Sequence, residues 1–103
     1  MNAASSVNVP YVTDHRDYTD GTNFTEYSTS ANQLSGAKVA TLFRKRDNSG
    51  APYFYVTFGS YTVNCGARHE VPTMEIRPSR TRDSKVYKTE AMAMKQITAH
   101  LYA

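Results

Sequence analysis

The sequence predicts an α+β fold in which a small antiparallel sheet of three to five strands carries a C-terminal helix on one face. Three observations predict it. Residues 38–65 hold strand-like runs of apolar and aromatic side chains, separated by turn residues. Residues 89–102 contain neither Gly nor Pro and repeat apolar side chains at helical spacing. The length of 103 residues suits a single domain.

The first predicted strand spans residues 38–46 and stops at the turn residues of 47–50. Pro52 stands just before the next strand, residues 53–58, where a missing N–H does the least harm. We expect these two strands to pair with Arg46 opposite Tyr53. A slip of one residue would turn the first strand over and bury Arg44, which argues for this register.

A second hairpin is predicted at Gly59-Ser60, because Gly accepts the positive φ at the first central position of a type II′ turn. The return strand is residues 61–65, so the hairpins run 38–46/53–58/61–65. One side of the second hairpin is then apolar throughout, and we expect it to face the core. That side holds Phe54, Val56, Phe58, Tyr61, Val63 and Cys65.

The remaining segments give weaker signals. Residues 23–30 predict an edge strand, and short strands are expected over 73–77 and in the KVYK run that begins at Lys85. Residues 1–22 are polar and follow neither strand nor helix period, so we expect a loosely ordered N-terminal arm. The single α+β domain is then 23–103.

The C-terminal helix, about 89–102, has clear end signals. Thr89 is a good N-cap, and an acidic residue follows it in the first turn. Met94, Ile97 and Leu101 form an apolar stripe that we expect to lie on the sheet. His100 is expected to lie away from this stripe.

Composition limits where the chain acts. No apolar run is long enough to cross a bilayer, and the N-terminus lacks the pattern of a signal peptide. A single cysteine, Cys65, cannot form an intrachain disulfide. We therefore expect a cytoplasmic protein with no membrane partner.

No cluster of residues suggests catalysis or metal binding. Cys65 is expected in the core, where a thiol is inert. Asp14, His15, Asp17 and Asp20 match neither a zinc nor a calcium spacing, and no glycine-rich phosphate loop occurs. The sequence therefore predicts a protein that is not an enzyme and that holds no metal and no cofactor.

Charge is unevenly distributed. Residues 1–37 carry one basic and four acidic side chains, a balance of −3, whereas residues 38–103 carry eleven basic and five acidic ones, a balance of +6. This asymmetry suggests an anionic partner for the second part, although solubility alone also explains it. The densest basic run consists of Arg77, Arg80, Arg82, Lys85 and Lys88.

The sheet face opposite the predicted core combines tyrosines with arginines. Its expected members are Leu42, Arg44, Arg46, Tyr53, Tyr55, Thr57 and Asn64. Aromatic side chains on an open sheet stack on bases, and arginines neutralise phosphates. The leading hypothesis is therefore a nucleic-acid-binding protein that takes single strands of DNA or RNA on this face, with the basic run adding phosphate contacts.

The alternative hypothesis places a protein on the same face. Tyr and Arg are also favoured in protein interfaces. The chain would then be a binding module or an inhibitor, of the kind found among phage or viral accessory proteins, that docks onto a host or cellular protein.

Overall fold

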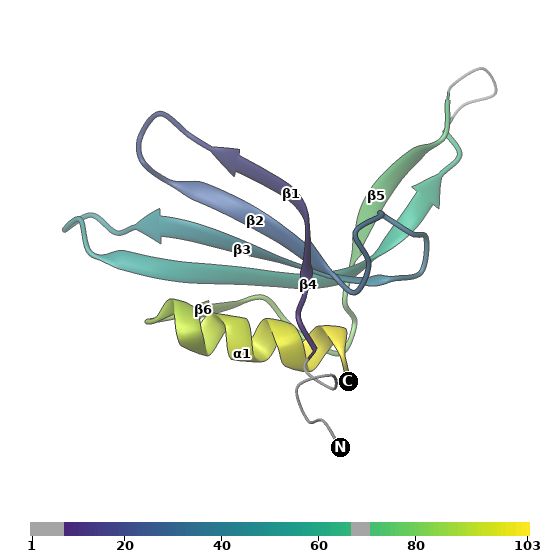
Figure 1. Cartoon of the computed structure of the whole chain (residues 1–103). Helices are drawn as coiled ribbons and strands as arrows, with labels where there is room; N and C mark the ends of the chain where they lie inside the picture. The colour runs from purple at the N-terminus through teal and green to yellow at the C-terminus, as the bar shows by residue number, and fades with distance from the viewer. Residues whose placement is uncertain (1–7, 67–70) are drawn as a thin grey trace.

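The computed structural model describes residues 8–66 and 71–103. Within these ranges the chain forms β1 (Tyr11–Asp17), β2 (Asn23–Ser28), β3 (Lys38–Arg46), β4 (Pro52–Asn64), β5 (Thr73–Pro78), β6 (Lys85–Tyr87) and α1 (Glu90–Leu101). The strands β1 to β5 lie side by side in chain order, β6 pairs with β4, and every pair is antiparallel. Because α1 packs on one face only (Figure 1), the predicted α+β class is confirmed.

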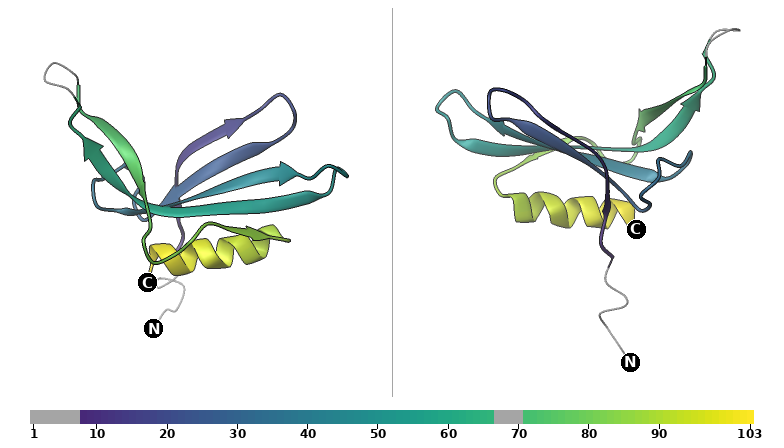
Figure 2. Two further views of the ribbon diagram at one scale, coloured as in Figure 1. Left: turned by 180° about the vertical axis from the view of Figure 1, so that it is seen from behind. Right: turned by 45° about the horizontal axis from the view of Figure 1, so that its top comes forward.

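The sheet is strongly bent. In Figures 1 and 2, the far end of β4 turns away from α1 together with β5, while β1 and β2 rise on the other side. The side of the sheet that α1 leaves uncovered is therefore a trough between two arms. We call this side the open face and the opposite side the helix side.

The bend falls within one long strand, and not between two. Residues 52–60 of β4 pair with β3, and residues 59–64 pair with β5. Gly59 does not have the positive φ that a type II′ turn needs. The predicted turn at Gly59-Ser60, and with it the hairpin 53–58/61–65, is wrong. A side chain on Gly59 would collide with the main-chain oxygen of Arg77, so glycine serves a close approach between strands here and not a turn.

The pairing of β3 with β4 differs by one residue from the expected register. Arg46 lies opposite Pro52, and Leu42 lies opposite Val56. This turns β3 over, so Leu42 is completely buried on the helix side instead of lying on the contact face. Arg44 shares that side and is held by an ion pair, because its Nε donates to Glu90 Oε1 at 2.6 Å. The rejected register is thus the real one, since Glu90 supplies the partner that a half-buried arginine needs.

The main core lies between the sheet and α1. Val56 and Phe58 of β4 belong to it as predicted, and Phe54 packs against its edge. Its buried members are Ala40, Leu42, Val56, Phe58, Ala93, Ile97 and Leu101. The helix begins as predicted, because the Thr89 hydroxyl accepts a hydrogen bond from the main-chain N–H of Met92 at 3.2 Å.

Other expected core residues lie elsewhere. Because β4 continues as a strand, Tyr61 and Val63 fall on the open face, and there Tyr61 is buried while Val63 is exposed. Cys65 lies beyond the end of β4 and is exposed, which corrects its placement in the core.

The N-terminal segment is part of the sheet. Residues 11–17, expected in a loosely ordered arm, form β1 and pair with β2 from Tyr11↔Ser28 to Asp17↔Asn23. The strand expected at 23–30 is therefore internal and not at the edge, because β1 covers its outer side. Residues 1–7 of the expected arm lie outside the described residues.

His100 points toward the sheet, which corrects the expectation that it lies away from the apolar stripe. It is buried, its Nε2–H donates to the carbonyl of Gly59 at 3.0 Å, and its ring centroid lies 5.2 Å from that of Phe58. Burial lowers the pKa of His100, and the nearby charges of Lys38 and Arg82 lower it further, against the opposing effect of the Gly59 hydrogen bond.

The lowered pKa of His100 predicts an acid-sensitive fold. Below the ordinary pKa of 6.5 the unfolded chain binds a proton at this site more readily than the folded chain does, so stability falls as the pH drops through that range. Urea unfolding at about pH 7.5 and about pH 5.5 measures the loss. His100→Gln should reduce the pH dependence, and an equal dependence in the variant would contradict the assignment.

The close approach at Gly59 predicts a selective sensitivity to added volume. Gly59→Ala should destabilise the fold by about 1–3 kcal/mol, because β5 must move to admit the methyl group. Ser60→Ala, in the next position of β4, is the matched control and should change the free energy of unfolding by less than about 0.5 kcal/mol. Equal effects in urea titrations would show that the β4–β5 approach is not tight.

Candidate functional site

Four aromatic side chains form a row across the open face. Phe24 of β2, Phe43 of β3 and Tyr55 of β4 occupy directly paired positions on neighbouring strands. Their ring centroids lie 5.7 Å apart for Phe24 and Phe43, and 5.9 Å apart for Phe43 and Tyr55. Tyr18, between β1 and β2, extends the row, with its ring 6.2 Å from that of Phe24. We call these four residues the aromatic row.

The row is accessible from the trough. Phe24, Phe43 and Tyr55 are half-buried by their neighbours, and Tyr18 is 47% exposed. Val86 of β6 pairs with Tyr55, so it continues the row on the far edge and is exposed. Cross-strand contacts between the rings fix their orientation before any ligand arrives.

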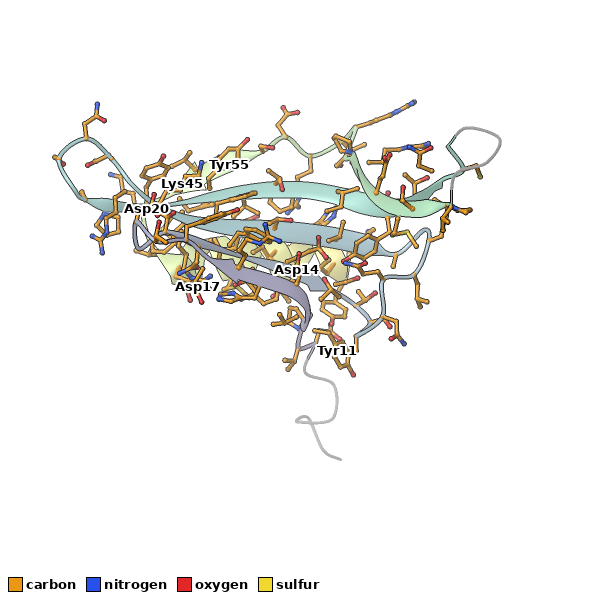
Figure 3. All side chains as sticks on the ribbon, turned by 90° about the horizontal axis from the view of Figure 1, so that it is seen from above. Tyr11, Asp14, Asp17, Asp20, Lys45 and Tyr55 are labelled. Atoms are coloured by element: carbon orange, nitrogen blue, oxygen red, sulfur yellow. The ribbon has the colours of Figure 1, made fainter. Side chains whose placement is uncertain are left out.

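Two cations accompany the row. Lys45 places its Nζ 5.6 Å from the centroid of the Phe43 ring, and Figure 3 shows Lys45 and Tyr55 at the same end of the sheet. Arg16 pairs with Phe24 and so shares its face. The row therefore offers flat apolar surfaces next to positive charge.

Three of the expected contact residues lie on the open face. Tyr55 belongs to the aromatic row, while Tyr53 and Thr57 flank it at alternate positions of β4. Leu42, Arg44 and Arg46 lie on the helix side for the reason given above. Asn64 also points away from the open face, and its Nδ2 donates to Glu75 Oε1 at 2.8 Å.

Three members of the basic run lie on the helix side and not beside the tyrosines. Arg77 pairs with Ser60, and Lys85 pairs with Val56, both at positions that face away from the trough. The guanidinium of Arg82 lies 5.2 Å from the centroid of the Phe58 ring. Arg80 lies in the β5–β6 loop, and Lys88 is exposed after β6.

The site residues predicted from the sequence do not include Arg16, Tyr18, Phe24, Phe43 and Lys45. Residues 23–30 were expected only as an edge strand. The expected register, with Arg46 opposite Tyr53, puts Phe43 opposite Val56 on the core side, whereas the structure pairs Phe43 with Tyr55. Pairing β2 with β3 in the correct register would have brought the two phenylalanines together.

A buried carboxylate, that of Glu26, joins neighbouring strands at the bottom of the trough by hydrogen bonds. Glu26 of β2 is 7% exposed and accepts hydrogen bonds from Tyr61 Oη at 2.6 Å, Thr13 Oγ1 at 2.7 Å and Gln33 Nε2 at 3.0 Å. Burial raises the pKa of Tyr61, and the hydrogen bond to Glu26 raises it further, so the phenol remains a neutral donor. These bonds link β1 and β2 to the β4–β5 arm and so fix the width of the trough.

In the ranges 8–66 and 71–103 no three His, Cys, Asp or Glu side chains gather in a way that suits a metal ion. Over the same ranges no helix is both long and apolar enough to span a bilayer.

Comparison with protein-family models, with curated protein sequences and with solved structures gives no match for this chain.

The Glu26 cluster predicts a large effect from a single carboxylate. Glu26→Ala removes the carboxylate that accepts from the buried Tyr61 hydroxyl and the half-buried Thr13 hydroxyl, and should destabilise the fold by about 1–3 kcal/mol. Glu75→Ala, which removes an exposed carboxylate from β5, should cost less than about 0.5 kcal/mol. Denaturant titration of both variants checks the difference, and a small effect at Glu26 would mean that the arms are held by main-chain pairing alone.

Proposed function

We propose that this chain is a non-enzymatic protein that binds single-stranded nucleic acid on its open face. The observation that carries the proposal is the aromatic row. Side chains from four separate places in the sequence converge into one line of rings on an accessible surface. Each ring offers a flat apolar surface to a base, and such stacking tolerates any base sequence. The bound nucleic acid would run across the β-strands, because the aromatic row itself runs across them.

Charge on the open face supports phosphate contacts of limited number. Arg16 and Lys45 are the two basic side chains beside the row, and Asp14 shares their face. A single strand bound here should release about two counterions through these cations. The logarithm of the binding constant should then fall with the logarithm of salt concentration with a slope of about −1.4. This shallow dependence distinguishes stacking from binding dominated by charge.

A protein partner is the second candidate, and a specific observation favours it. The β4–β5 arm carries exposed apolar side chains on the same open face, with Val63 43% exposed and Ile76 42% exposed. Exposed apolar surface of this kind suits a protein better than a phosphate backbone. In this case the chain acts as a binding module or an inhibitor on a host or cellular protein. Both candidates are proposed for the cytoplasm, because the single, exposed Cys65 forms no intrachain disulfide.

The test replaces the rings of the row one at a time. Tyr18→Ala and Tyr55→Ala should each weaken binding of a short oligothymidylate by about 1–3 kcal/mol, since each removes one stacking surface. Fluorescence anisotropy measures the affinity, and a thermal melt confirms that each variant folds. Lys45→Ala should make the salt slope shallower by about 0.7.

Tyr11→Ala is the matched control. Tyr11 is 53% exposed but lies away from Tyr55 and Lys45 in Figure 3, so its loss should leave affinity unchanged. Full-strength binding by both row variants would overturn the proposal. A wild-type chain that binds no oligonucleotide at low salt would leave the protein partner as the remaining candidate.

A further inference from the structure

A polar pocket lies on the helix side, away from the aromatic row. It has a volume of about 330 Å³ and is formed by the start of β3, the bend of β4, the end of β5 and the C-terminal part of α1. Its lining includes the basic side chains of Lys38, Arg77 and Arg80 and the hydroxyl groups of Ser60, Ser79 and Thr81, and none of its lining residues is acidic.

The three basic side chains come from different elements. Lys38 opens β3, Arg77 belongs to β5, and Arg80 lies in the loop that follows. All three are exposed, and in the part of the chain that the structure describes none takes part in an ion pair. Cations that face one pocket without acidic partners repel one another, so an anion between them lowers the electrostatic energy.

The loop is shaped by its own hydrogen bonds. The main-chain N–H of Ser79 donates to the carbonyl of Phe58 at 2.9 Å, which holds the start of the loop on β4. Ser79 Oγ then accepts from the main-chain N–H groups of Thr81 at 3.2 Å and Arg82 at 3.1 Å. The pocket wall is therefore fixed before a ligand binds, which reduces the entropy cost of binding.

The surroundings of His100 show that the electrostatic potential at the pocket is positive. It lines the pocket and is fixed to Gly59, and the positive charges of Lys38 and Arg82 act on its ring. Two more cations, Arg77 and Arg80, line the same pocket. The field at this site therefore favours negative charge.

We propose that this pocket binds a phosphate group, whose oxygens pair with Lys38, Arg77 and Arg80 and accept hydrogen bonds from the hydroxyls of Ser60 and Thr81. Arginine and lysine together with hydroxyl donors form the usual partners of a phosphate. The phosphate comes either from the backbone of a nucleic acid or from a free phosphate or nucleotide. The site goes beyond the stacking function, because it lies on the opposite side of the sheet.

The experiment titrates the ¹⁵N-labelled chain with pyrophosphate at low salt and follows amide shifts. Saturable shifts should appear at Ser60, at Arg77 and at 79–81, and the pKa of His100 should rise in the complex because the bound anion offsets nearby positive charge. Arg80→Gln and Lys38→Gln should each weaken binding by about tenfold, the loss expected for one charge-assisted hydrogen bond. Thermal melts confirm that both variants fold.

Lys95→Gln is the control, because Lys95 is exposed on α1 and does not line the pocket. Equal losses in the three variants, or shifts spread over all basic surfaces, would overturn the proposal as non-specific charge attraction. Absence of pocket shifts with both pyrophosphate and oligothymidylate would overturn it as well.

The source of the phosphate is decided by a second titration with oligothymidylate. Pocket shifts with the oligonucleotide alone identify a nucleic-acid backbone, whereas saturable binding of pyrophosphate identifies a site for free phosphate groups. Repeating both titrations with Tyr55→Ala separates the two proposals. Loss of stacking should leave pyrophosphate binding unchanged, and failure at the pocket leaves the open-face affinity to be judged by itself.

Discussion

The pairing of β4 along both of its edges is the constraint on which the rest of this structure depends. One edge of β4 carries β3, while the other carries β6 near its start and β5 near its end. The strand turns away from α1 between these partners, and Gly59 permits the closest approach to β5. The first part of β4 therefore supplies the core under α1, and the second part supplies one wall of the trough. Both candidate binding sites lie beside this strand.

The sheet separates two kinds of surface chemistry. Aromatic rings gather on the open face, whereas most of the basic residues of the second half lie on the helix side. The Arg44–Glu90 ion pair illustrates the separation. Arg44 was expected beside the tyrosines, but it lies on the helix side and binds Glu90 in the first turn of α1. A ligand held by stacking and a ligand held by charge thus approach from opposite sides. The molecule is equipped for two contacts that need not compete.

Sequence reasoning recovered features that depend on short stretches of chain. The helix with its Thr89 cap, the strand 38–46 and the α+β class all follow from local composition and period. The predictions were wrong where the local structure depends on contacts between segments that are distant in the sequence. Glycine at 59 is compatible with a turn or with a close strand, and only the position of Arg77 distinguishes them. The one-residue register of β3 depended on Glu90, which lies far along the chain, and the aromatic row depended on that register in turn.

The order of the strands also bears on how the chain reaches this state. Strands β1 to β5 pair with their neighbours in sequence, so each hairpin forms from a short loop at small entropic cost. The main core is covered by α1, which comes after all six described strands in the sequence and therefore contacts partners that are more distant along the chain. Without α1 on the sheet, the core side chains Leu42 and Val56 would face water. A chain that stops before its helix forms would leave these apolar side chains exposed, and exposed apolar surface of this kind favours self-association.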